Sequence, residues 1–554
     1  MRKNKILLVR VPEIETSIRK NDFRSVGIGS LTIPLGITYL SSVIRNQNHH
    51  DVQILDLYAE YYELYISDCV SDPFKLITLS KKILSNTILQ YRPDVVGFSA
   101  PFLFQHNFVK ELINFTKESF PLVRIYLGGY PTIVPKIVMK DIDGLDVLFI
   151  GEAEKTITRV LDIEGSDSRY ANINGISYRD NNNIIINKSL NLTYDINDIP
   201  YPSFDMLPLD KYKKILGSNA FPIMTSRSCP FTCNFCSSFL YSGRGLRLRK
   251  IDNITKEMEV LHKKYNIDSL FIRDDNFIVN KEHVKQFLRN LIKYNMTVPW
   301  CDSSGFHVNS IDEEILDLCK ASGCSEVIFA VESGCGRVLK DIMNKNVNLE
   351  HALKMAKYCH EIGLPIQCYF VIGNPGETQE EIKMTVDFAR EMQVDSCTFS
   401  IATPFPGTKY YDLAVEKGYL IHNPDFIIGL KYMEANLETD QLSSDDLKDI
   451  QYDANMRVNF LENRLLFGDT QALERALEKY IRIFKQYNFH VIALLIQGYI
   501  YAKLGNGGES VNKFTHVKQL LKDKDIDRAY GKYIQWDTPA TNYYRQWLHN
   551  GKST

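Results

Sequence analysis

"SRSCPFTCNFCSS", residues 226–238, places Cys229, Cys233 and Cys236 on one short loop with the spacing Cys-x3-Cys-x2-Cys. Thiolates at such short spacings are typical ligands of an iron–sulfur cluster. A closed structural zinc site would need four ligands, usually as two separated pairs, and no second pair or His-x3-His follows. A thioredoxin-type redox pair would not need a third cysteine. Three ligands leave one iron of a four-iron cluster without a protein ligand. The loop therefore predicts a cluster whose open iron can bind a reactant.

The cysteine loop follows the first strand of a series in which six strand-like runs alternate with helical stretches. The runs are "PIMTSRS" from Pro222, "SLFIRDD" from Ser269, "VPWCDSSG" from Val298, "EVIFAVES" from Glu326, "IQCYFVIG" from Ile366 and "SCTFSIATP" from Ser396. Two of the helices between them have glycine stops, at Gly323 and Gly363. The alternation predicts a partial (β/α)6 TIM-like barrel over residues 219–442, or a complete barrel. Chemistry in such folds takes place at the carboxyl ends of the strands, where the cysteine loop falls.

Residues 1–155 show a second alternation of strands and helices. Short apolar runs begin at Lys5, Asp51, Asp94, Val123 and Asp146, with amphipathic stretches such as "PLGITYLSSVIRN" between them. This rhythm predicts an α/β fold with a doubly wound, Rossmann-like parallel sheet, whose ligands bind outside the carboxyl ends of the strands. Small and polar residues follow the strands there: Ser99, Gly128, Gly129 and Glu152.

Two further segments complete the chain. Residues 156–218 contain "RDNNNIIIN", typical of a hairpin turn, and the proline-rich "NDIPYPSFDMLP", and are interpreted as a linker. Residues 443–554 have a helical pattern. The spacing of Gly498, Tyr501, Gly505, Ser510 and Phe514 is similar to one tetratricopeptide repeat, and a plain helical hairpin packed on the barrel is the alternative.

Composition restricts the classes of partner and location. The formal net charge of −2 gives no electrostatic basis for binding nucleic acid or an anionic membrane. The N-terminal apolar run is too short for a signal peptide, and the longest later run, from Val491, is well short of the roughly 18 residues of a membrane span. Eleven cysteines, an odd number, indicate reduced thiols rather than a disulfide framework. These features predict a soluble cytoplasmic protein with no transmembrane segment.

The stretch "CPFTCNFC", with the aromatic Phe235 before the third cysteine, resembles the cluster loop of the radical S-adenosylmethionine (SAM) superfamily. The resemblance implies a [4Fe-4S] cluster on Cys229, Cys233 and Cys236, and Phe235 beside SAM. In that family the open iron chelates the amino and carboxylate groups of SAM. One electron, from a flavodoxin or ferredoxin type of reductant, then cleaves the sulfonium to a 5′-deoxyadenosyl radical.

Later strand ends support the same resemblance. "FIRDDNF" supplies Asp274 and Asp275 where the family places acidic groups for the ammonium of SAM, although a solvated acidic turn would look the same. "FAVESG" resembles the fourth-strand motif and makes Glu332 and Ser333 candidates for the ribose hydroxyls. "YFVIGNPGET" resembles the fifth-strand segment, whose backbone from Val371 to Gly373 would pair with adenine. A purely structural role is the alternative for each of these residues.

The segments "PLGITYLSSVI", "DVVGFSAP", "LGGYPTIVP" and "FIGEAEKT" resemble the cobalamin-binding domain that precedes many radical SAM barrels. The glycines at 128 and 129 would let the backbone approach a bulky cofactor, and Ser99 and Glu152 would supply polar contacts, unless these residues only shape turns. The Asp-x-His-x-x-Gly motif, which supplies a histidine ligand to cobalt in methionine-synthase-like domains, is absent. The histidines at 49, 50 and 106 do not stand in such a motif. The resemblance implies cobalamin without a histidine ligand, or a domain that has lost cobalamin. Gly27 and Gly29 form only a partial dinucleotide-binding motif.

The resemblance implies a cobalamin-dependent radical SAM enzyme, a C-methyltransferase that transfers a methyl group from methylcobalamin to an unactivated carbon of a small-molecule or lipid substrate. The alternative within the same class is non-methylating chemistry such as ring closure, oxidation or rearrangement. Methylthiolation would call for further N-terminal cluster cysteines, and only Cys69 lies there. An alternative of another class is a protein that docks a partner through residues 443–554.

Overall fold

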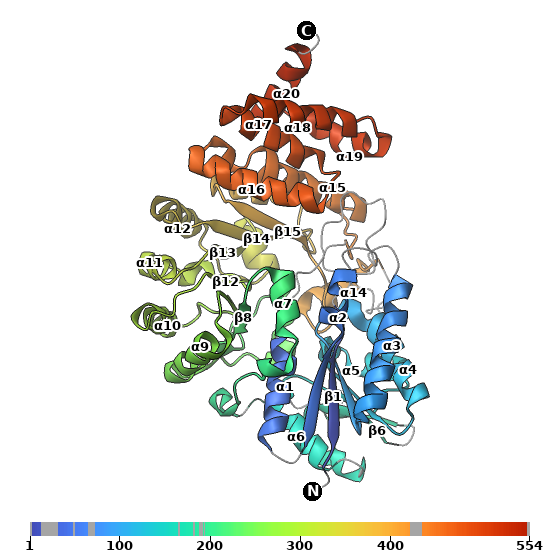
Figure 1. Ribbon diagram of the computed structural model, residues 1–554. Coiled ribbons are helices and arrows are strands. Elements are labelled where there is room, and N and C mark those ends of the chain that lie inside the picture. Colours follow the sequence, from blue (N-terminus) through green and yellow to red (C-terminus); the bar gives the residue numbers. More distant parts are fainter. Residues whose placement is uncertain are drawn as a thin grey trace.

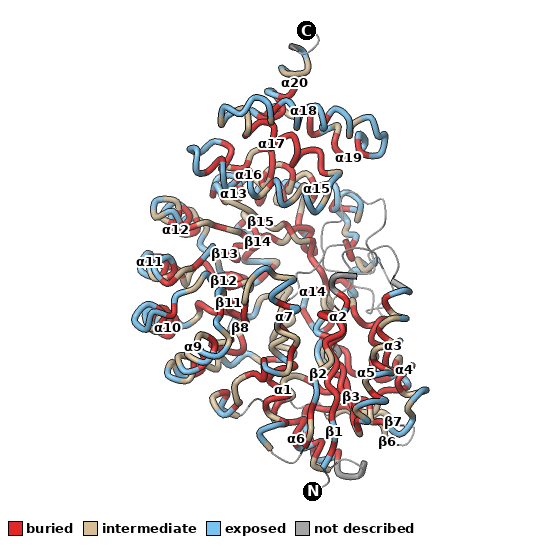
Figure 2. The backbone as a smooth tube through the Cα atoms, in the orientation of Figure 1, coloured by how far each residue is buried: buried red, intermediate tan, exposed pale blue. Residues whose placement is uncertain are grey.

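A computed structural model describes residues 3–12, 32–47, 50–64, 73–163, 167–180, 183–187, 192, 194–421 and 435–550. Three units follow one another along the chain (Figure 1): an N-terminal α/β domain, a central partial barrel and a C-terminal group of helices beyond the last barrel strand. The strands of the first two units are mostly buried, and the outward faces of the helices are exposed (Figure 2). The candidate residues Gly27, Gly29, His49 and Cys69 lie outside the described residues.

The N-terminal domain is built on a seven-stranded sheet in the order β2-β1-β3-β4-β5-β6-β7, whose first five strands are parallel. The parallel strands are β1 (Lys5–Arg10), β2 (Asp51–Asp56), β3 (Val95–Ala100), β4 (Arg124–Gly129) and β5 (Val147–Phe149). In β1, Ile6 and Leu8 face one core and Leu7 and Val9 face the other, because side chains alternate along a strand. The predicted doubly wound fold is confirmed.

Helices cover both faces of this sheet. The core with Ile6 and Leu8 includes residues of α1 (Leu35–Asn46) and α6 (Glu154–Asp162). The opposite core includes residues of α3 (Pro73–Tyr91), α4 (His106–Ser119) and α5 (Pro135–Asp141), and α2 (Leu57–Leu64) follows β2 directly. The open edge at the carboxyl ends of the strands is therefore left for a ligand.

The segment expected as a linker contributes to the sheet. Strand β6 (Ile176–Asp180) pairs antiparallel with β5, and β7 (Asn183–Asn187) pairs antiparallel with β6. The hairpin pattern of the sequence thus extends the N-terminal sheet by two strands. The chain then continues through short 3-10 turns to α7 (Leu209–Leu216), which lies against α2.

The central unit is a partial barrel of six parallel strands, as the sequence predicted. One sheet has the order β12-β11-β8 and the other β13-β14-β15, and parallel bridges from Trp300 to Cys324 and from Phe306 to Phe329 connect them. The strands are β8 (Ala220–Ile223), β11 (Ser269–Ile272), β12 (Trp300–Asp302), β13 (Val327–Glu332), β14 (Ile366–Ile372) and β15 (Ser396–Ile401). The helices are α9 (Ile251–Tyr265), α10 (Lys281–Lys293), α11 (Glu313–Ala321), α12 (Leu349–Ile362), α13 (Gln379–Glu391) and α14 (Lys409–Lys417).

The cysteine loop leaves the barrel between β8 and α9. It runs from β9 (Ser226–Arg227) through α8 (Phe239–Ser242) to β10 (Arg247–Leu248), and β9 and β10 pair antiparallel. The two ends of the loop are thereby closed into a small ribbon, which brings Arg227 opposite Arg247.

The described part of the C-terminal unit contains six α-helices around a separate hydrophobic core, with α17 buried almost throughout. They are α15 (Ser444–Asn455), α16 (Thr470–Gln486), α17 (Val491–Lys503), α18 (Gly507–Leu520), α19 (Lys524–Ile534) and α20 (Pro539–Asn550). Gly498 of α17 lies against the ring of Phe514 in α18, so a larger side chain at 498 would clash. The helical pattern of the sequence is thus present as a hairpin of α17 and α18. Among the described residues, no helix is long and apolar enough to cross a membrane.

Candidate active site between the barrel and the N-terminal domain

The three loop cysteines are unpaired thiols of intermediate exposure at one end of the barrel. Asn276, just after β11, directs its amide toward the sulfur of Cys229 at 3.6 Å. Burial raises the pKa of Cys229, and it raises the pKa of Cys233 to about 11, with charge on Cys236 acting in the same direction on both thiols. Cys229 and Cys233 therefore lie close enough to Cys236 for its charge to act on them, and their raised pKa values favour the protonated thiols until a metal displaces the protons.

The residue types of the loop suit an iron–sulfur cluster. Each cysteine of an iron–sulfur cluster binds a different iron, so its ligands surround a larger volume than the ligands of a single ion do. The donor set is also sulfur only, which is the chemistry that such clusters require.

Contacts from several parts of the barrel hold the loop in place. The backbone N–H of Asn234 donates to the carbonyl of Met343 at 2.9 Å, and its side-chain amide donates to the carbonyl of Ile342 at 2.7 Å. Phe235 packs on a buried cluster that includes Tyr410, with ring centroids 6.1 Å apart. Phe231 stacks on His307 at 4.2 Å. The non-cysteine residues of the loop therefore anchor it to the barrel.

The two candidate aspartates have different surroundings. Asp274 is fully buried, and it accepts hydrogen bonds from the backbone N–H of Thr225 at 2.6 Å and from the hydroxyls of Thr225 and Ser226. These contacts give Asp274 a structural role, joining β11 to the segment before the cysteine loop. Asp275 accepts the backbone N–H of Ser228 at 2.7 Å, directly before Cys229. Burial raises the pKa of both carboxyl groups.

Glu332 and Ser333 point to different partners at the end of β13. Glu332 has a left-handed backbone conformation, with φ of 71°, and its carboxylate pairs with Lys345 at 2.8 Å. Charge on both Glu332 and Lys345 acts on the Cys233 thiol, so this pair lies near the cysteines. Ser333 is fully buried and contacts the hydroxyl of Thr385 at 3.0 Å, which indicates a structural role.

The predicted adenine segment lies at the end of β14. The carbonyl of Val371 accepts a hydrogen bond from the side chain of Asn374 at 2.9 Å, and Val371 packs on the same cluster as Phe235. Gly373 has φ of 72°, and a Cβ there would lie 2.5 Å from Leu447 of α15. Glycine is favoured at this position because its left-handed backbone conformation would strain any other residue.

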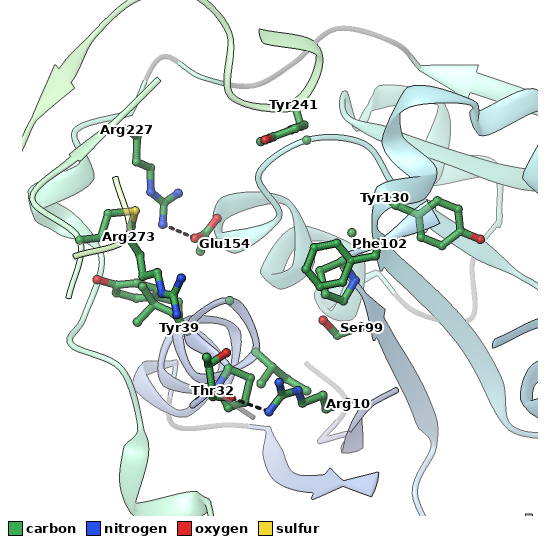
Figure 3. A pocket seen from close by; sticks show the side chains of 18 of the residues that line it. Arg10, Thr32, Tyr39, Ser99, Phe102, Tyr130, Glu154, Arg227, Tyr241 and Arg273 are labelled. Atoms are coloured by element: carbon green, nitrogen blue, oxygen red, sulfur yellow. Dashed lines mark hydrogen bonds and ion pairs between the residues drawn. The ribbon is translucent and has the colours of Figure 1, made fainter. Parts of the chain in front are cut away.

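A cavity of about 640 Å³ lies between the barrel and the N-terminal domain. Ser99 and Gly129 line it from the N-terminal sheet, and Arg227, Ser237 and Tyr241 line it from the cysteine loop and its flanks (Figure 3). A smaller cavity of about 260 Å³ shares Ser99 and Gly129 with it and continues into the N-terminal domain, past Gly128 and Glu152. All four N-terminal candidates therefore lie on one continuous wall.

The wall has the features that a large planar cofactor needs. Five glycines line the two cavities, at positions 36, 97, 128, 129 and 151. Gly129 has φ of 108°, and a Cβ there would lie 2.2 Å from the carbonyl of Ala100. A backbone free of side chains at the carboxyl ends of β3 and β4 lets a bulky ligand approach closely, so the residues fit a cobalamin.

The described histidines of the N-terminal domain are held away from this wall. His106 is buried between the hydroxyl of Tyr130 at 2.5 Å and the carboxylate of Asp141 at 2.6 Å. His50 lies 3.5 Å from Asp162. Neither lines the cavities.

The sequence interpretation missed the charged residues that border the site. Arg227 and Arg247 flank the cysteine loop and pair with Glu152 and Glu154. Lys345 pairs with Glu332, and Arg10 and Arg273 line the larger cavity. In the sequence, the arginine-rich stretch "GRGLRLRK" right after the cysteine loop could have indicated one of these residues, Arg247.

These features define a class: an iron–sulfur barrel enzyme joined to a doubly wound cofactor-binding domain. The model of the radical SAM superfamily matches residues 223–389, and that of the B12 binding domain matches residues 24–161. The chain is 31% identical over 422 residues to an uncharacterized methyltransferase of Pyrococcus horikoshii, covering 76% of this chain and 85% of that protein. It is 29% identical over 426 residues to the cytidylyl-2-hydroxyethylphosphonate methyltransferase of Streptomyces wedmorensis, covering 70% and 79%.

Among solved structures, the cobalamin-dependent S-adenosylmethionine radical enzyme OxsB, with aqua-cobalamin and S-adenosylmethionine bound, has the same fold. The TM-score is 0.65 at 16% identity, covering 99% of this chain and 84% of that one. The chain belongs to the family of cobalamin-dependent radical SAM enzymes. The cofactors of this family are a [4Fe-4S] cluster, SAM and cobalamin.

Proposed function

We propose that this enzyme transfers a methyl group to an unactivated carbon of a small-molecule or lipid substrate. One observation carries the proposal: the flank of the cysteine loop and the carboxyl ends of the N-terminal strands line the same cavity. When bound, the cluster with SAM supplies a carbon radical that removes a hydrogen atom, and cobalamin supplies the methyl group. The methyltransferases among its relatives support this chemistry over ring closure or oxidation.

We assign the cluster to Cys229, Cys233 and Cys236. Asn276 and Ser238 would hydrogen-bond the cluster-bound sulfurs, since they already contact Cys229 at 3.6 Å and Cys236 at 3.2 Å. Lys345 would offset the negative charge that three thiolates bring into a partly buried site. Hydrogen bonds and charge around a cluster set its reduction potential.

For SAM, we assign Asp275 and Glu332, whose charges act on the Cys229 and Cys233 thiols. We also assign Phe235 as an apolar wall, and the backbone of Val371 and Gly373 as the adenine contact. Asp275 also orients the peptide before Cys229, so it would hold ligand and cluster in one geometry. The fully buried Asp274 and Ser333 would support these residues without touching SAM.

For cobalamin, we assign Ser99, Gly128, Gly129 and Glu152. The aromatic and aliphatic lining of the larger cavity, including Phe102, Leu103 and Phe405, would keep water away from the reacting carbon. The substrate would enter the same cavity, beside Arg10 and Arg273. The proposal also includes a reductant of the flavodoxin or ferredoxin type and a cytoplasmic location. It includes a protein partner at the C-terminal helices as well.

The test is metal analysis of protein purified without oxygen, reconstituted with iron, sulfide and hydroxocobalamin, and then desalted. A full four-iron cluster with one cobalt per chain is the expected result. The loaded protein is then given a one-electron reductant, SAM with a deuterated methyl group and a panel of candidate substrates, and the products are searched for added deuterated methyl groups. Iron without cobalt would contradict methyl transfer and leave only radical initiation.

A further inference from the structure

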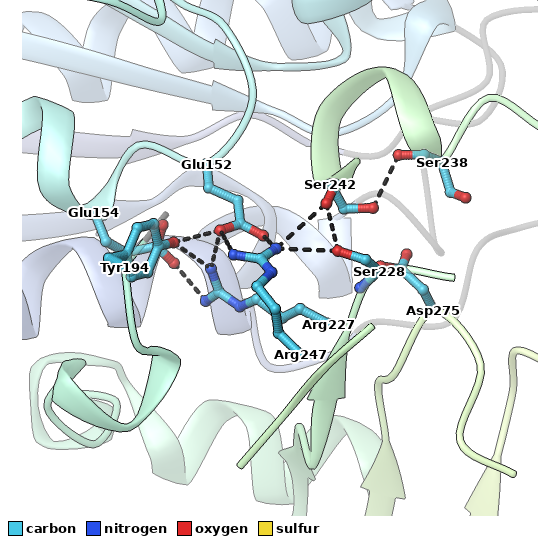
Figure 4. A network of polar contacts seen from close by, with 9 residues as sticks. All are labelled: Glu152, Glu154, Tyr194, Arg227, Ser228, Ser238, Ser242, Arg247 and Asp275. Atoms are coloured by element: carbon cyan, nitrogen blue, oxygen red, sulfur yellow. Dashed lines mark hydrogen bonds and ion pairs between the residues drawn. The ribbon is translucent and has the colours of Figure 1, made fainter. Parts of the chain in front are cut away.

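A buried network of ion pairs joins the two halves of the molecule beside the cysteine loop (Figure 4). Glu152 lies 2.5 Å from Arg247 and 3.1 Å from Arg227, and Glu154 lies 2.5 Å from Arg227. The four side chains are between 8% and 17% exposed. The charges of the two carboxylates and the two guanidinium groups cancel. Removing one of these side chains would leave a buried charge unpaired, so the network is stable only while all four are present.

The network includes the linker as well. The hydroxyl of Tyr194 donates to Glu152, and Arg227 donates to the same hydroxyl oxygen at 3.0 Å. Burial raises the pKa of Tyr194 far above its ordinary value, so its proton stays in place. All three parts of the chain, N-terminal domain, linker and barrel, therefore meet at Glu152.

From Glu152 the network continues directly to the cluster loop. Arg247 donates to the hydroxyl of Ser228 at 3.1 Å and to the carbonyl of Ser242 at 3.3 Å. Ser228 precedes Cys229 and has φ of 71°, a conformation that costs a serine free energy and persists only where neighbours impose it. Its N–H is bound by Asp275 at 2.7 Å. Arg247 and Asp275 thus fix the peptide that sets the position of Cys229.

The same residues form part of both cavity walls. Glu152 lines the smaller cavity, Arg227 lines the larger one, and Glu154 lines both. A ligand in either cavity would therefore contact a member of the network. The guanidinium of Arg247 binds both Glu152 and Ser228. A shift in the position of the Glu152 carboxylate would therefore move Arg247 and alter its contact with Ser228.

We propose that Glu152 and Arg247 are positioning residues that couple occupancy of the N-terminal cavity to the geometry of the cluster loop. For the identity of the two cofactors this inference rests on the proposed function. The link from Glu152 through Arg247 to Ser228 does not depend on the proposed function, because it joins residues of the protein alone. The role of Glu152 therefore extends beyond a polar contact to cobalamin. Through Arg247, it connects the N-terminal domain to the loop that carries Cys229.

The test is hydrogen–deuterium exchange of the whole cofactor-free protein, read in peptides covering residues 226–242. Glu152→Gln lies in the other domain, yet we expect it to speed exchange in this loop by about tenfold, the effect of losing one charge-assisted hydrogen bond. Exchange in β13, β14 and β15 should not change. Glu152→Asp, which keeps the charge, should restore part of the protection. The matched control is Arg289→Gln, which removes an ion pair to Glu314 that is half exposed.

Arg247→Lys provides a second variant if Glu152→Gln does not fold. Lysine keeps the charge but cannot bind the carboxylate in two places and Ser228 as well, so it should also loosen the loop. The coupling itself is measured by adding hydroxocobalamin. The wild-type loop should exchange more slowly with hydroxocobalamin bound, and the loop of the Glu152→Gln variant should respond much less.

Two results would overturn the inference. One is wild-type exchange of residues 226–242 in both Glu152→Gln and Arg247→Lys. The other is faster exchange throughout the barrel, which would indicate general destabilisation. An optical titration of hydroxocobalamin reports separately whether cobalamin binds, so failure of the proposed function is distinguished from failure of the coupling.

Discussion

Two non-glycine residues with left-handed backbones, Ser228 and Glu332, lie beside the proposed cluster cysteines. Such conformations cost of order 1–3 kcal/mol each and persist where the surroundings impose them. Ser228 is held by Asp275 and Arg247, and Glu332 is held by Lys345. At the scale of single residues, the site thus includes two unusual backbone positions, one with its N–H bound by Asp275 and the other with its side chain paired to Lys345.

Replacing Cys233 by alanine should abolish reductive cleavage of SAM, because a cluster that lacks one of its three protein ligands is lost or has an altered potential. The measurements are iron content, the paramagnetic resonance spectrum of the reduced protein and release of 5′-deoxyadenosine. Cys301→Ala is the control, since this thiol lies in β12 outside the loop. Cleavage retained by Cys233→Ala would contradict the cluster assignment.

Asp302 should make the protein less stable as pH rises. Burial raises the pKa of its carboxyl group to about 7, and the ordinary value in an unfolded chain is about 3.9. Between these values the native state holds a proton that the unfolded state has released, so the stability present below about pH 4 is lost as pH approaches 7. The loss from this group is at most about 4 kcal/mol.

Asp302→Asn should remove this contribution, and the variant should be more stable than the wild type at pH 8 and similar to it at pH 4. Urea unfolding at a series of pH values is the measurement. Asp445→Asn, at a position 90% exposed, is the control. An unchanged pH slope in Asp302→Asn would mean that this carboxyl group ionises normally in the folded protein.

At the scale of elements, the last barrel strand has no neighbouring strand on its outer side among the described residues, and the C-terminal unit covers it. Asn459, in the π-helical turn Met456–Leu461, binds both the N–H and the carbonyl of Cys397 at 2.8 Å. Gln451 donates to the carbonyl of Phe399 at 2.6 Å. Side-chain amides thus take the place of a seventh strand and satisfy the edge of the barrel.

Asn459→Ala should lower the free energy of unfolding by about 2 kcal/mol, because it leaves a buried donor and a buried acceptor of β15 without partners. Urea unfolding and hydrogen exchange of residues 396–401 are the measurements. The exposed Asn346 is the position for a control substitution to alanine. Wild-type protection of β15 in the variant would show that another group satisfies this edge.

The elements that could be predicted were those whose pattern is local. The apolar run of the first strand and the glycine stop at Gly363 are visible in the sequence. The pairing of β6 with β5 was not, because it depends on contacts between residues far apart in the chain. For the same reason Asp274 and Asp275 looked equivalent, although only the structure shows that Asp274 is enclosed by Thr225 and Ser226.

At the scale of the whole molecule, the N-terminal sheet and the barrel place their ligand-binding ends against one another. In both folds ligands bind at the carboxyl ends of the parallel strands, and in this chain the two ends share one cavity of about 640 Å³. The linker residue Tyr194 and the ion pairs of Glu152 hold this arrangement. The contact between domains is therefore also the wall of the site, so a ligand there should stabilise the chain as a whole.

Gly128→Leu tests this arrangement directly. Gly128 lines the smaller cavity, and a Cβ there would make an ordinary contact of 3.9 Å with Phe149, so the backbone tolerates a side chain while the cavity loses volume. We expect hydroxocobalamin affinity, measured by optical titration, to fall at least about tenfold, which corresponds to about 1.4 kcal/mol. Gly508→Leu, at an exposed position in α18, is the matched control and should bind as the wild type does.

Thermal unfolding separates loss of binding from loss of folding in this variant. A ligand that binds only the native state raises its stability by RT ln(1 + [L]/Kd), about 2.7 kcal/mol at a hundredfold excess over Kd. Hydroxocobalamin should therefore raise the melting temperature of the wild type and of Gly508→Leu, and leave that of Gly128→Leu nearly unchanged. The melting temperature without ligand should be similar in all three proteins. Undiminished stabilisation of Gly128→Leu by hydroxocobalamin would place the cofactor elsewhere on the molecule and separate the N-terminal cavity from the chemistry of the barrel.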